Sequence, residues 1–361
     1  MDLNSRERLL NSIRGKETDR LAWSPFLAYF WDYQPESVKK AGQLQFLKEI
    51  GADPLFRGFC TLIKVNYKKS NVIDKTSGNE RVVIHETPVG NLETRYTYTT
   101  NGNTWFITKH PVKTGEDLKV LTYLNEDMVI EADFSKYRNG LALLGEEALL
   151  IPIITPEMKS SFQSMIETWM GTEEVAYAVY DYEDELLACL DSMKKNSIKS
   201  VEMAVECGAE AYIFWEDSST GNLSPAFFRE YISDEISAWA DIIHREGSLL
   251  VHHACGQIKG LISDMSKTGA DVIESISPPP TGDLHIYDAR KMAPENICLI
   301  GGIEPTVLLN SKMDELRDHV ADIIERTGKK GFVLANADSC PPGVEVDKFR
   351  MISELVKSIG R

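Results

Sequence analysis

The chain has 361 residues, of which 43% are hydrophobic and 26% are charged, and its formal net charge is −16. This is an ordinary globular composition, and the length lies within the range of α/β barrels. This acidic balance argues against a nucleic-acid partner, because phosphate binding needs a basic surface. No stretch approaches the roughly 20 apolar residues of a membrane helix, and the start has no apolar signal core. We therefore expect no membrane partner and a cytoplasmic location.

The first third of the chain predicts a short helix, a strand and an antiparallel meander. Apolar residues at helical spacing predict a helix over residues 5–14, and residues 21–26 read as a buried strand. The residues Phe26, Tyr29, Phe30 and Trp31 follow, and a loop at this place can present their rings to a substrate, although packing in the core is an equal alternative. Residues 72–114 contain three alternating, β-rich runs, which predict a meander inserted into a parallel core.

From residue 149 onward, short apolar runs alternate with long amphipathic stretches. The runs predict strands at 149–154, 211–214, 248–251, 271–274, 298–301 and 331–335. Helical patterns separate most of them, notably at 184–207, 225–246 and 313–327. Repeated strand and helix units of this number favour an α/β fold of the (β/α)8 TIM-barrel type. We interpret residues 1–361 as a single barrel domain, with an N-terminal helical segment and the meander at 72–114 as an insertion.

Reactive side chains follow several of these strands, where a barrel places its active groups. His253 and Cys255 follow one strand, and Cys340 follows the last. An imidazole and two thiolates suit zinc, and three protein ligands leave a fourth position open for catalysis. The alternative is that the cysteines are small buried residues and that the histidine bonds a carbonyl group. With the barrel in place, the convergence favours a metal site.

Other polar residues occupy the same predicted mouth. Glu216 and Asp217 follow the strand at 211–214, and we interpret them as catalytic acids or bases, with Glu216 also a candidate fourth zinc ligand. Their alternative role is to cap the helix that begins near Ser224. Asn336 ends the last strand and is a candidate substrate-binding residue.

Several motifs resemble those of the uroporphyrinogen decarboxylase superfamily, and more closely those of its zinc-dependent branch, the corrinoid-protein methyltransferases. The motifs are Arg6-Glu7-Arg8, residues 15–20, His253-Ala254-Cys255-Gly256, residues 301–305 and Cys340-Pro341-Pro342. The resemblance implies a TIM barrel whose zinc is held by His253, Cys255 and Cys340. It also implies a partner, because members move a methyl group between a small molecule and the cobalt of a corrinoid (cobalamin) on a separate protein.

One departure from the family bears on the substrate. Uroporphyrinogen decarboxylase holds substrate carboxylates with an arginine-rich loop after the first strand, whereas residues 26–33 contain no arginine here. We therefore predict a zinc-dependent methyltransferase, an O-demethylase component that takes methyl from a small methoxylated substrate, with an aromatic ring suiting the aromatic segment. The first alternative is methyl transfer to a thiol of the coenzyme M type. The others are a uroporphyrinogen-type decarboxylase and a non-catalytic corrinoid-binding barrel.

Overall fold

The computed structural model describes residues 3–100 and 103–360, which fold into two compact units. Of the described residues, unit 1 comprises 3–62, 134–153 and 207–360, and unit 2 comprises 63–100, 103–133 and 154–206. No helix in the described part of the chain is both long and apolar enough to cross a membrane.

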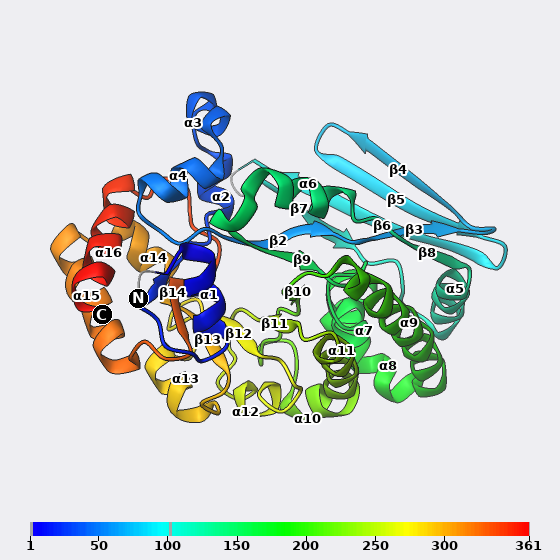
Figure 1. Cartoon of the computed structure of the whole chain (residues 1–361). Coiled ribbons are helices and arrows are strands. Elements are labelled where there is room, and N and C mark those ends of the chain that lie inside the picture. The colour runs from blue at the N-terminus through cyan, green and yellow to red at the C-terminus, as the bar shows by residue number, and fades with distance from the viewer. Residues whose placement is uncertain (1–2, 101–102, 361) are drawn as a thin grey trace. The chain divides into compact units, whose positions relative to one another are not determined.

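Unit 1 is built on a curled sheet of eight parallel strands (Figure 1). The strands, in their order across the sheet, are β1 (Ala22–Trp23), β14 (Phe332–Asn336), β13 (Cys298–Ile303), β12 (Val272–Ile276), β11 (Leu249–His253), β10 (Ala211–Trp215), β9 (Leu149–Ile153) and β2 (Leu55–Thr61). Asp53 links the two outermost strands, because its backbone N–H donates to the Trp23 carbonyl at 2.7 Å and its side chain accepts from the Trp23 N–H at 3.1 Å.

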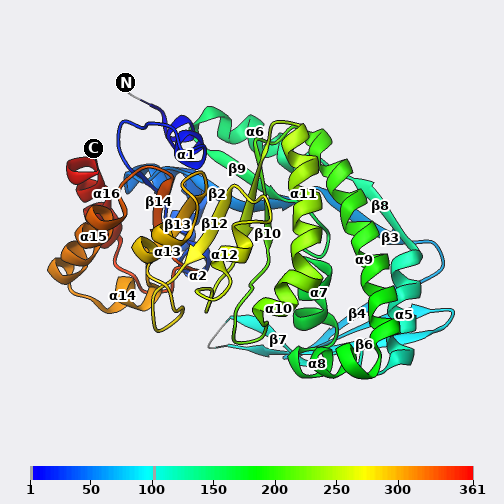
Figure 2. The same ribbon diagram turned by 90° about the horizontal axis from the view of Figure 1, so that it is seen from below.

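Helices alternate with these strands, as the apolar periodicity predicted (Figure 2). They are α1 (Ser5–Ile13), α2 (Ala28–Asp32), α3 (Glu36–Ala41), α4 (Gln43–Glu49), α6 (Ser135–Leu144), α10 (Pro225–Phe227), α11 (Ser233–Arg245), α12 (Ile262–Met265), α13 (Ile286–Met292), α14 (Pro305–Asn310), α15 (Met313–Thr327) and α16 (Val346–Ile359). The α/β fold of the TIM-barrel type that the sequence predicted is thus confirmed, including the N-terminal helical segment.

Unit 2 contains the antiparallel sheet that the sequence predicted. Its four strands are β4 (Asn71–Ser77), β5 (Glu80–Thr87), β6 (Gly90–Thr99) and β7 (Thr104–Lys109), paired in chain order. Strands β3 (Ile63–Tyr67) and β8 (Met128–Ala132) form a separate antiparallel pair. The helices of unit 2 are α5 (Gly115–Glu126), α7 (Ser161–Ser164), α8 (Thr172–Asp181) and α9 (Glu183–Ala204), and α5 lies along α9 (Figure 2).

The interior of unit 1 follows from the two-residue period of its strands. Successive strand residues face opposite sides, so every second residue contributes to the core inside the sheet. The inward residues of this core include Leu55, Ile213, Val251 and Val272, and α1 adds Leu9, Leu10 and Ile13. Two residues further along the same strands, on the same face, are Arg57, Trp215, His253 and Glu274. The strand period therefore stacks a polar layer on the apolar core, toward the carboxyl ends of the strands.

A charge cluster joins α1 to the start of β2. Arg8 donates to Asp19 at 2.7 Å and to the fully buried Asp53 at 2.6 Å, and Arg20 donates to Asp53 at 2.9 Å. Burial alone would raise the pKa of Asp19, but the hydrogen bond and charge of Arg8 outweigh it and hold that pKa below its ordinary value. Asp19 therefore stabilises the fold above its unfolded-state pKa and loses this effect as the pH falls through the folded-state value.

Replacing Asp19 with asparagine tests this cluster. We expect Asp19→Asn to lower the free energy of unfolding at pH 7 by about 1 kcal/mol, the size of a partly exposed ion pair. The difference between wild type and variant should shrink as the pH falls below about 4, where the wild-type carboxylate also becomes protonated. Urea denaturation at a series of pH values measures the loss of unfolding free energy at pH 7 and its decrease at lower pH. A difference that does not vary with pH would mean that the charge of Asp19 is not what stabilises the cluster.

Candidate functional site

Three potential metal ligands converge at the carboxyl ends of two neighbouring strands. His253 ends β11, Cys255 follows it, and Asp217 lies two residues beyond the end of β10, whose last residue pairs with His253. One ligand atom from each of the three residues lies within 4.8 Å of the others. The Cys255 thiol donates to Asp217 Oδ1 at 3.2 Å, and His253 Nε2 lies 3.7 Å from the same oxygen. The cluster brings nitrogen, sulfur and oxygen donors to one point.

A buried ion pair supports His253 from the other side of its ring. His253 Nδ1 lies 2.9 Å from Glu274 Oε1, and Arg57 Nε donates to Glu274 Oε2 at 2.8 Å. The side chains of Arg57 and Glu274 are 2% and 1% exposed. A carboxylate on Nδ1 holds the proton at that nitrogen and orients the ring, which leaves Nε2 facing Asp217 as the ligand atom.

The charges around this pair shift the pKa values of both groups. Burial would lower the pKa of His253, but the hydrogen bond to Glu274 and the negative charges of Glu274, Asp217 and Asp338 raise it above its ordinary value. Burial would raise the pKa of Glu274, but the charge of Arg57 and the contact with His253 hold it below its usual range. The surroundings of His253 therefore favour positive charge, whether a proton or a metal ion supplies it.

The neighbouring His252 faces the opposite side of β11. Its ring lies 4.6 Å from that of Phe214 and 6.4 Å from that of Phe228, and burial lowers its pKa to about 3. It is therefore a neutral packing residue, because successive strand side chains point to opposite faces.

An aromatic wall, which we define as Phe26 and Trp215, borders the cluster. Their rings stack at 5.8 Å, and the His253 ring lies 4.3 Å from that of Trp215 and 6.3 Å from that of Phe26. Gly58, with φ of +62°, permits this arrangement, because a Cβ there would come within 2.4 Å of the Trp215 ring. Phe26 and Trp215 are both partly exposed.

Cys340, the predicted third zinc ligand, lies in the loop after β14 and does not belong to the three-residue cluster. Its backbone N–H donates to the Phe26 carbonyl at 2.9 Å, which ties it to the base of the aromatic wall. Burial raises the pKa of the Cys340 thiol, so it stays protonated near neutral pH unless a cation stabilises the thiolate. Its role as a ligand stays a prediction.

The two predicted catalytic acids differ in exposure. Glu216 is fully buried, whereas the side chain of Asp217 is 35% exposed and its backbone has a φ of +44°. The helix that follows is capped by Ser224, which accepts from the Phe227 N–H at 3.1 Å. The capping role that was the alternative for Glu216 and Asp217 is therefore filled by another residue.

The structure separates the predicted substrate-binding residues into different environments. Phe30 is 1% exposed and packs against Phe46 and Phe349, which is the contact set of a core residue. The ring of Trp31 also packs on Phe46, at 5.8 Å, and Tyr29 is 40% exposed. Among the four predicted aromatic residues, it is Phe26 whose ring contacts His253 in the described structure.

The side-chain amide of Asn336, a predicted substrate-binding residue, bonds to the backbone of Phe26. Its Oδ1 accepts from the Phe26 N–H at 2.9 Å, and its Nδ2 donates to the Phe26 carbonyl at 3.0 Å and to the Asp338 carbonyl. These bonds use both ends of the side-chain amide. Asn336 therefore positions the aromatic wall.

Arg57 and Trp215 are parts of the site that the sequence did not predict. The signal that could have found them is the strand period, since each lies two residues beyond an inward core residue, Leu55 or Ile213. Glu274 likewise lies two residues beyond an inward core residue, Val272.

The donor set suits zinc. Zinc accepts imidazole nitrogen, thiolate sulfur and carboxylate oxygen, and its histidine ligands generally donate their other ring N–H to a carboxylate. His253, Cys255 and Asp217 supply the three donor types, and Glu274 supplies the supporting carboxylate. The cluster is thus a candidate metal centre.

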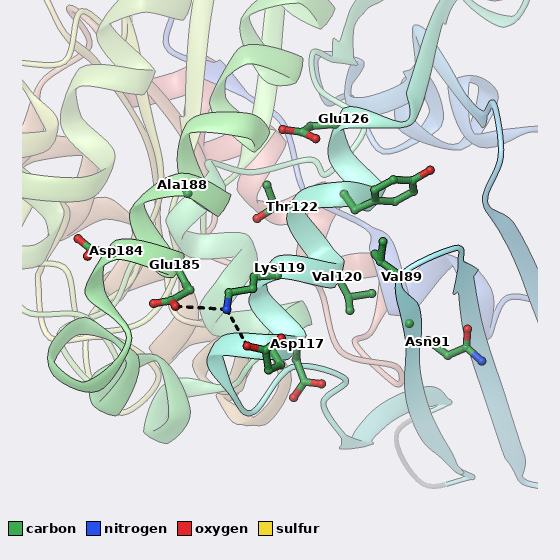
Figure 3. A pocket seen from close by; sticks show the side chains of 13 residues that line it. Val89, Asn91, Asp117, Lys119, Val120, Thr122, Glu126, Asp184, Glu185 and Ala188 are labelled. Atoms are coloured by element: carbon green, nitrogen blue, oxygen red, sulfur yellow. Dashed lines mark hydrogen bonds and ion pairs between the residues drawn. The ribbon is translucent and has the colours of Figure 1, made fainter.

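A pocket within unit 2 lacks such chemistry. It measures about 800 Å³ and lies between α5, α9 and the turn from β5 to β6 (Figure 3). Its lining combines carboxylates with Val89, Val120 and Tyr123, and Lys119 is paired with Glu116 and Glu185. No cysteine or histidine lines it, so this pocket does not offer a catalytic zinc site.

Sequence comparisons with known proteins match about half of the chain. A family model described as uroporphyrinogen decarboxylase (URO-D) matches residues 160–359. The uroporphyrinogen decarboxylase of Gloeobacter violaceus is 26% identical over 179 residues, 49% of either chain. A uroporphyrinogen decarboxylase of Thermus thermophilus is 24% identical over 172 residues, 47% of this chain and 48% of the relative. The chain thus spans about half the length of the curated relatives it matches.

A solved structure extends the likeness of fold to nearly the whole chain. A methyltransferase from Methanosarcina mazei superposes on it with a TM-score of 0.63, covering 98% of both chains at 14% sequence identity. At this identity the likeness concerns the fold.

Proposed function

The chain belongs to the uroporphyrinogen decarboxylase family, and on that premise we propose that it is a zinc-dependent methyltransferase. Its substrates in this proposal are a small methoxylated compound, which gives up the methyl group, and the cobalt of a corrinoid on a separate protein, which receives it. The observation that carries the proposal is the meeting of His253, Cys255 and Asp217 at the ends of β10 and β11, with Glu274 holding the imidazole. The methyltransferase fold of the Methanosarcina mazei protein also supports it.

The proposed ligands are His253, Cys255 and Cys340, with Asp217 as a further ligand that substrate can replace. His253 and Cys255 follow β11 directly, so the strand fixes both. The side chain of Asp217 is 35% exposed, whereas that of His253 is 4% exposed. Asp217 is therefore the ligand that substrate can replace more easily. Cys340 joins the set on the sequence prediction, and its bond to the Phe26 backbone keeps it at the same loops.

These residues would hold a zinc ion, which would supply a Lewis acid for the ether oxygen of the substrate and so make the methyl–oxygen bond easier to break. The protein's own residues bind and orient the substrate. Phe26 and Trp215 offer stacking surface beside His253, and Asn336 fixes Phe26 in place. Asp217 accepts a hydrogen bond from the Cys255 thiol and is proposed to take its proton, and the more deeply buried Glu216 is the second acid proposed for proton transfer.

A methyl-transfer assay tests the proposal. Protein purified after zinc-supplemented expression is mixed with cob(I)alamin and a panel of methoxybenzenes and methoxybenzoates, and absorbance follows the conversion to methylcobalamin. We expect conversion with at least one aromatic methyl ether and release of one phenol per methyl group. A thiol acceptor supplied with methylcobalamin tests the alternative of transfer to a coenzyme M-type thiol. Decarboxylation of uroporphyrinogen without any methyl transfer would contradict the proposal.

A further inference from the structure

We propose that Arg57 determines specificity at the mouth of the barrel, by binding the carboxylate of an aromatic substrate that lies against Phe26 and Trp215. The inference rests on the proposed function for the reaction, but the binding it describes is measurable without turnover. It narrows the methoxylated substrate to one that carries an anionic group.

The hydrogen bonds of Arg57 leave part of its guanidinium unused. A guanidinium has five N–H donors. Nε donates to Glu274 Oε2 at 2.8 Å, and Nη2 donates to the Ser24 carbonyl at 3.1 Å. Nη1 has no hydrogen-bond partner in the described structure, although the side chain is 2% exposed. Buried donors are nearly always paired, so an unused pair of N–H groups on a buried cation indicates a missing acceptor.

The unpaired nitrogen distinguishes Arg57 from the other lysine and arginine side chains of the described residues. Within residues 3–100 and 103–360, Arg57 is the one lysine or arginine with a buried nitrogen that lacks a partner. Arg8, which is buried to a similar degree, uses Nε, Nη1 and Nη2 on Asp19, Asp53 and the Leu3 carbonyl. The chain can therefore satisfy a buried arginine fully where its role is structural. Close to Arg57, the buried Ser24 hydroxyl also has no partner.

The surroundings of Arg57 define the shape of the ligand. Its guanidinium carbon lies 5.5 Å from the centre of the Phe26 ring, which stacks on Trp215, and Trp215 reaches the ring of His253. The aromatic wall thus joins the unused donors of Arg57 to the candidate metal centre. A planar ring suits a stacked aromatic surface, and a carboxylate suits paired N–H donors of arginine. An aromatic carboxylate combines both features.

The test compares an acid with its neutral amide. Binding of 4-methoxybenzoate and 4-methoxybenzamide to the protein as purified is measured by isothermal titration calorimetry. We expect the acid to bind at least tenfold more tightly than the amide. Arg57→Lys keeps a positive charge beside Glu274 but loses the planar set of donors, and it should weaken acid binding at least tenfold without changing amide binding. Arg229→Lys alters an exposed arginine of the same unit, paired with Asp264, and should leave both affinities unchanged.

Three results would overturn the inference: no binding of the acid to wild type, equal binding of acid and amide, or acid binding unaffected in Arg57→Lys. Circular dichroism and the melting temperature show whether the variant folds. If it does not, the comparison of acid and amide on wild type decides the matter. Zinc content and methyl transfer measured on the same sample separate the two proposals. Acid-selective binding without methyl transfer removes the proposed function alone, whereas methyl transfer without preference for the acid removes the role of Arg57.

Discussion

Replacing Cys255 with alanine is expected to abolish both zinc binding and methyl transfer. The variant loses the sulfur atom that lies beside His253 and Asp217, in a group of potential ligand atoms that are all within 4.8 Å of one another. Loss of a supporting contact typically costs 10–100-fold in metal affinity or activity, and loss of a direct ligand costs more. We expect zinc to fall from about one to below about 0.1 per chain, and the methyl-transfer rate to fall about 10³-fold or more. Elemental analysis and the cob(I)alamin assay measure the two effects.

Cys207→Ala is the matched control for this variant. Cys207 is partly buried like Cys255, but its sulfur lies 3.6 Å from the Tyr212 hydroxyl and outside the ligand cluster. It should retain full zinc content and activity. If Cys255→Ala kept its zinc while Cys207→Ala behaved like wild type, the metal centre would have to be sought elsewhere.

Of the substitutions proposed here, Glu274→Ala should lower the free energy of unfolding the most. Glu274 accepts from Arg57 and holds His253, and both charged side chains of the pair are at most 2% exposed. Its removal leaves the Arg57 charge buried without a counter-charge, which typically costs about 3–5 kcal/mol in the free energy of unfolding. We also expect zinc affinity to fall about 10–100-fold, because His253 loses the contact that orients its ring. Urea denaturation followed by circular dichroism measures the first effect.

Two further variants show whether burial is the cause. Glu274→Gln keeps the shape and one acceptor oxygen, so its loss of stability should be smaller than that of Glu274→Ala. Asp264→Ala removes the partner of the exposed Arg229, and should cost less than about 1 kcal/mol. Equal losses in Glu274→Ala and Asp264→Ala would contradict the idea that Glu274 neutralises a buried charge.

Much of the fold could be predicted because the barrel strands are short apolar runs between amphipathic helices. The run at 298–301 corresponds to β13 (Cys298–Ile303), and the helical pattern at 313–327 corresponds to α15 (Met313–Thr327). Strand β2 (Leu55–Thr61) was missed. Arg57 and Gly58 interrupt its apolar pattern. Arg57 belongs to the polar layer of the site, and Gly58 leaves room for the Trp215 ring. The same two residues that contribute to the site therefore prevented the prediction of this strand from its apolar pattern.

The candidate site was predictable only where its residues lie close in sequence. His253 and Cys255 are two positions apart at a strand end, so a local motif brings them together. The contact between Arg57 and Glu274 joins residues 217 positions apart, on strands β2 and β12, which are not neighbours in the sheet. Only the curl of the sheet brings these two inward-facing side chains together. The aromatic segment shows the converse problem, since Phe26 and Phe30 are alike in sequence. The turn into α2 directs Phe26 to His253 and buries Phe30 in the core.

We propose that the mouth of this barrel holds a catalytic zinc ion. Elemental analysis of wild-type protein, purified without a metal-chelating tag after zinc-supplemented expression, tests it most directly. We predict about one zinc ion per chain, because His253, Cys255 and Asp217 already present suitable donor atoms within 4.8 Å of one another. Metal-free protein from the same preparation would contradict the presence of a catalytic zinc ion and would indicate that the chain is a metal-independent member of its family.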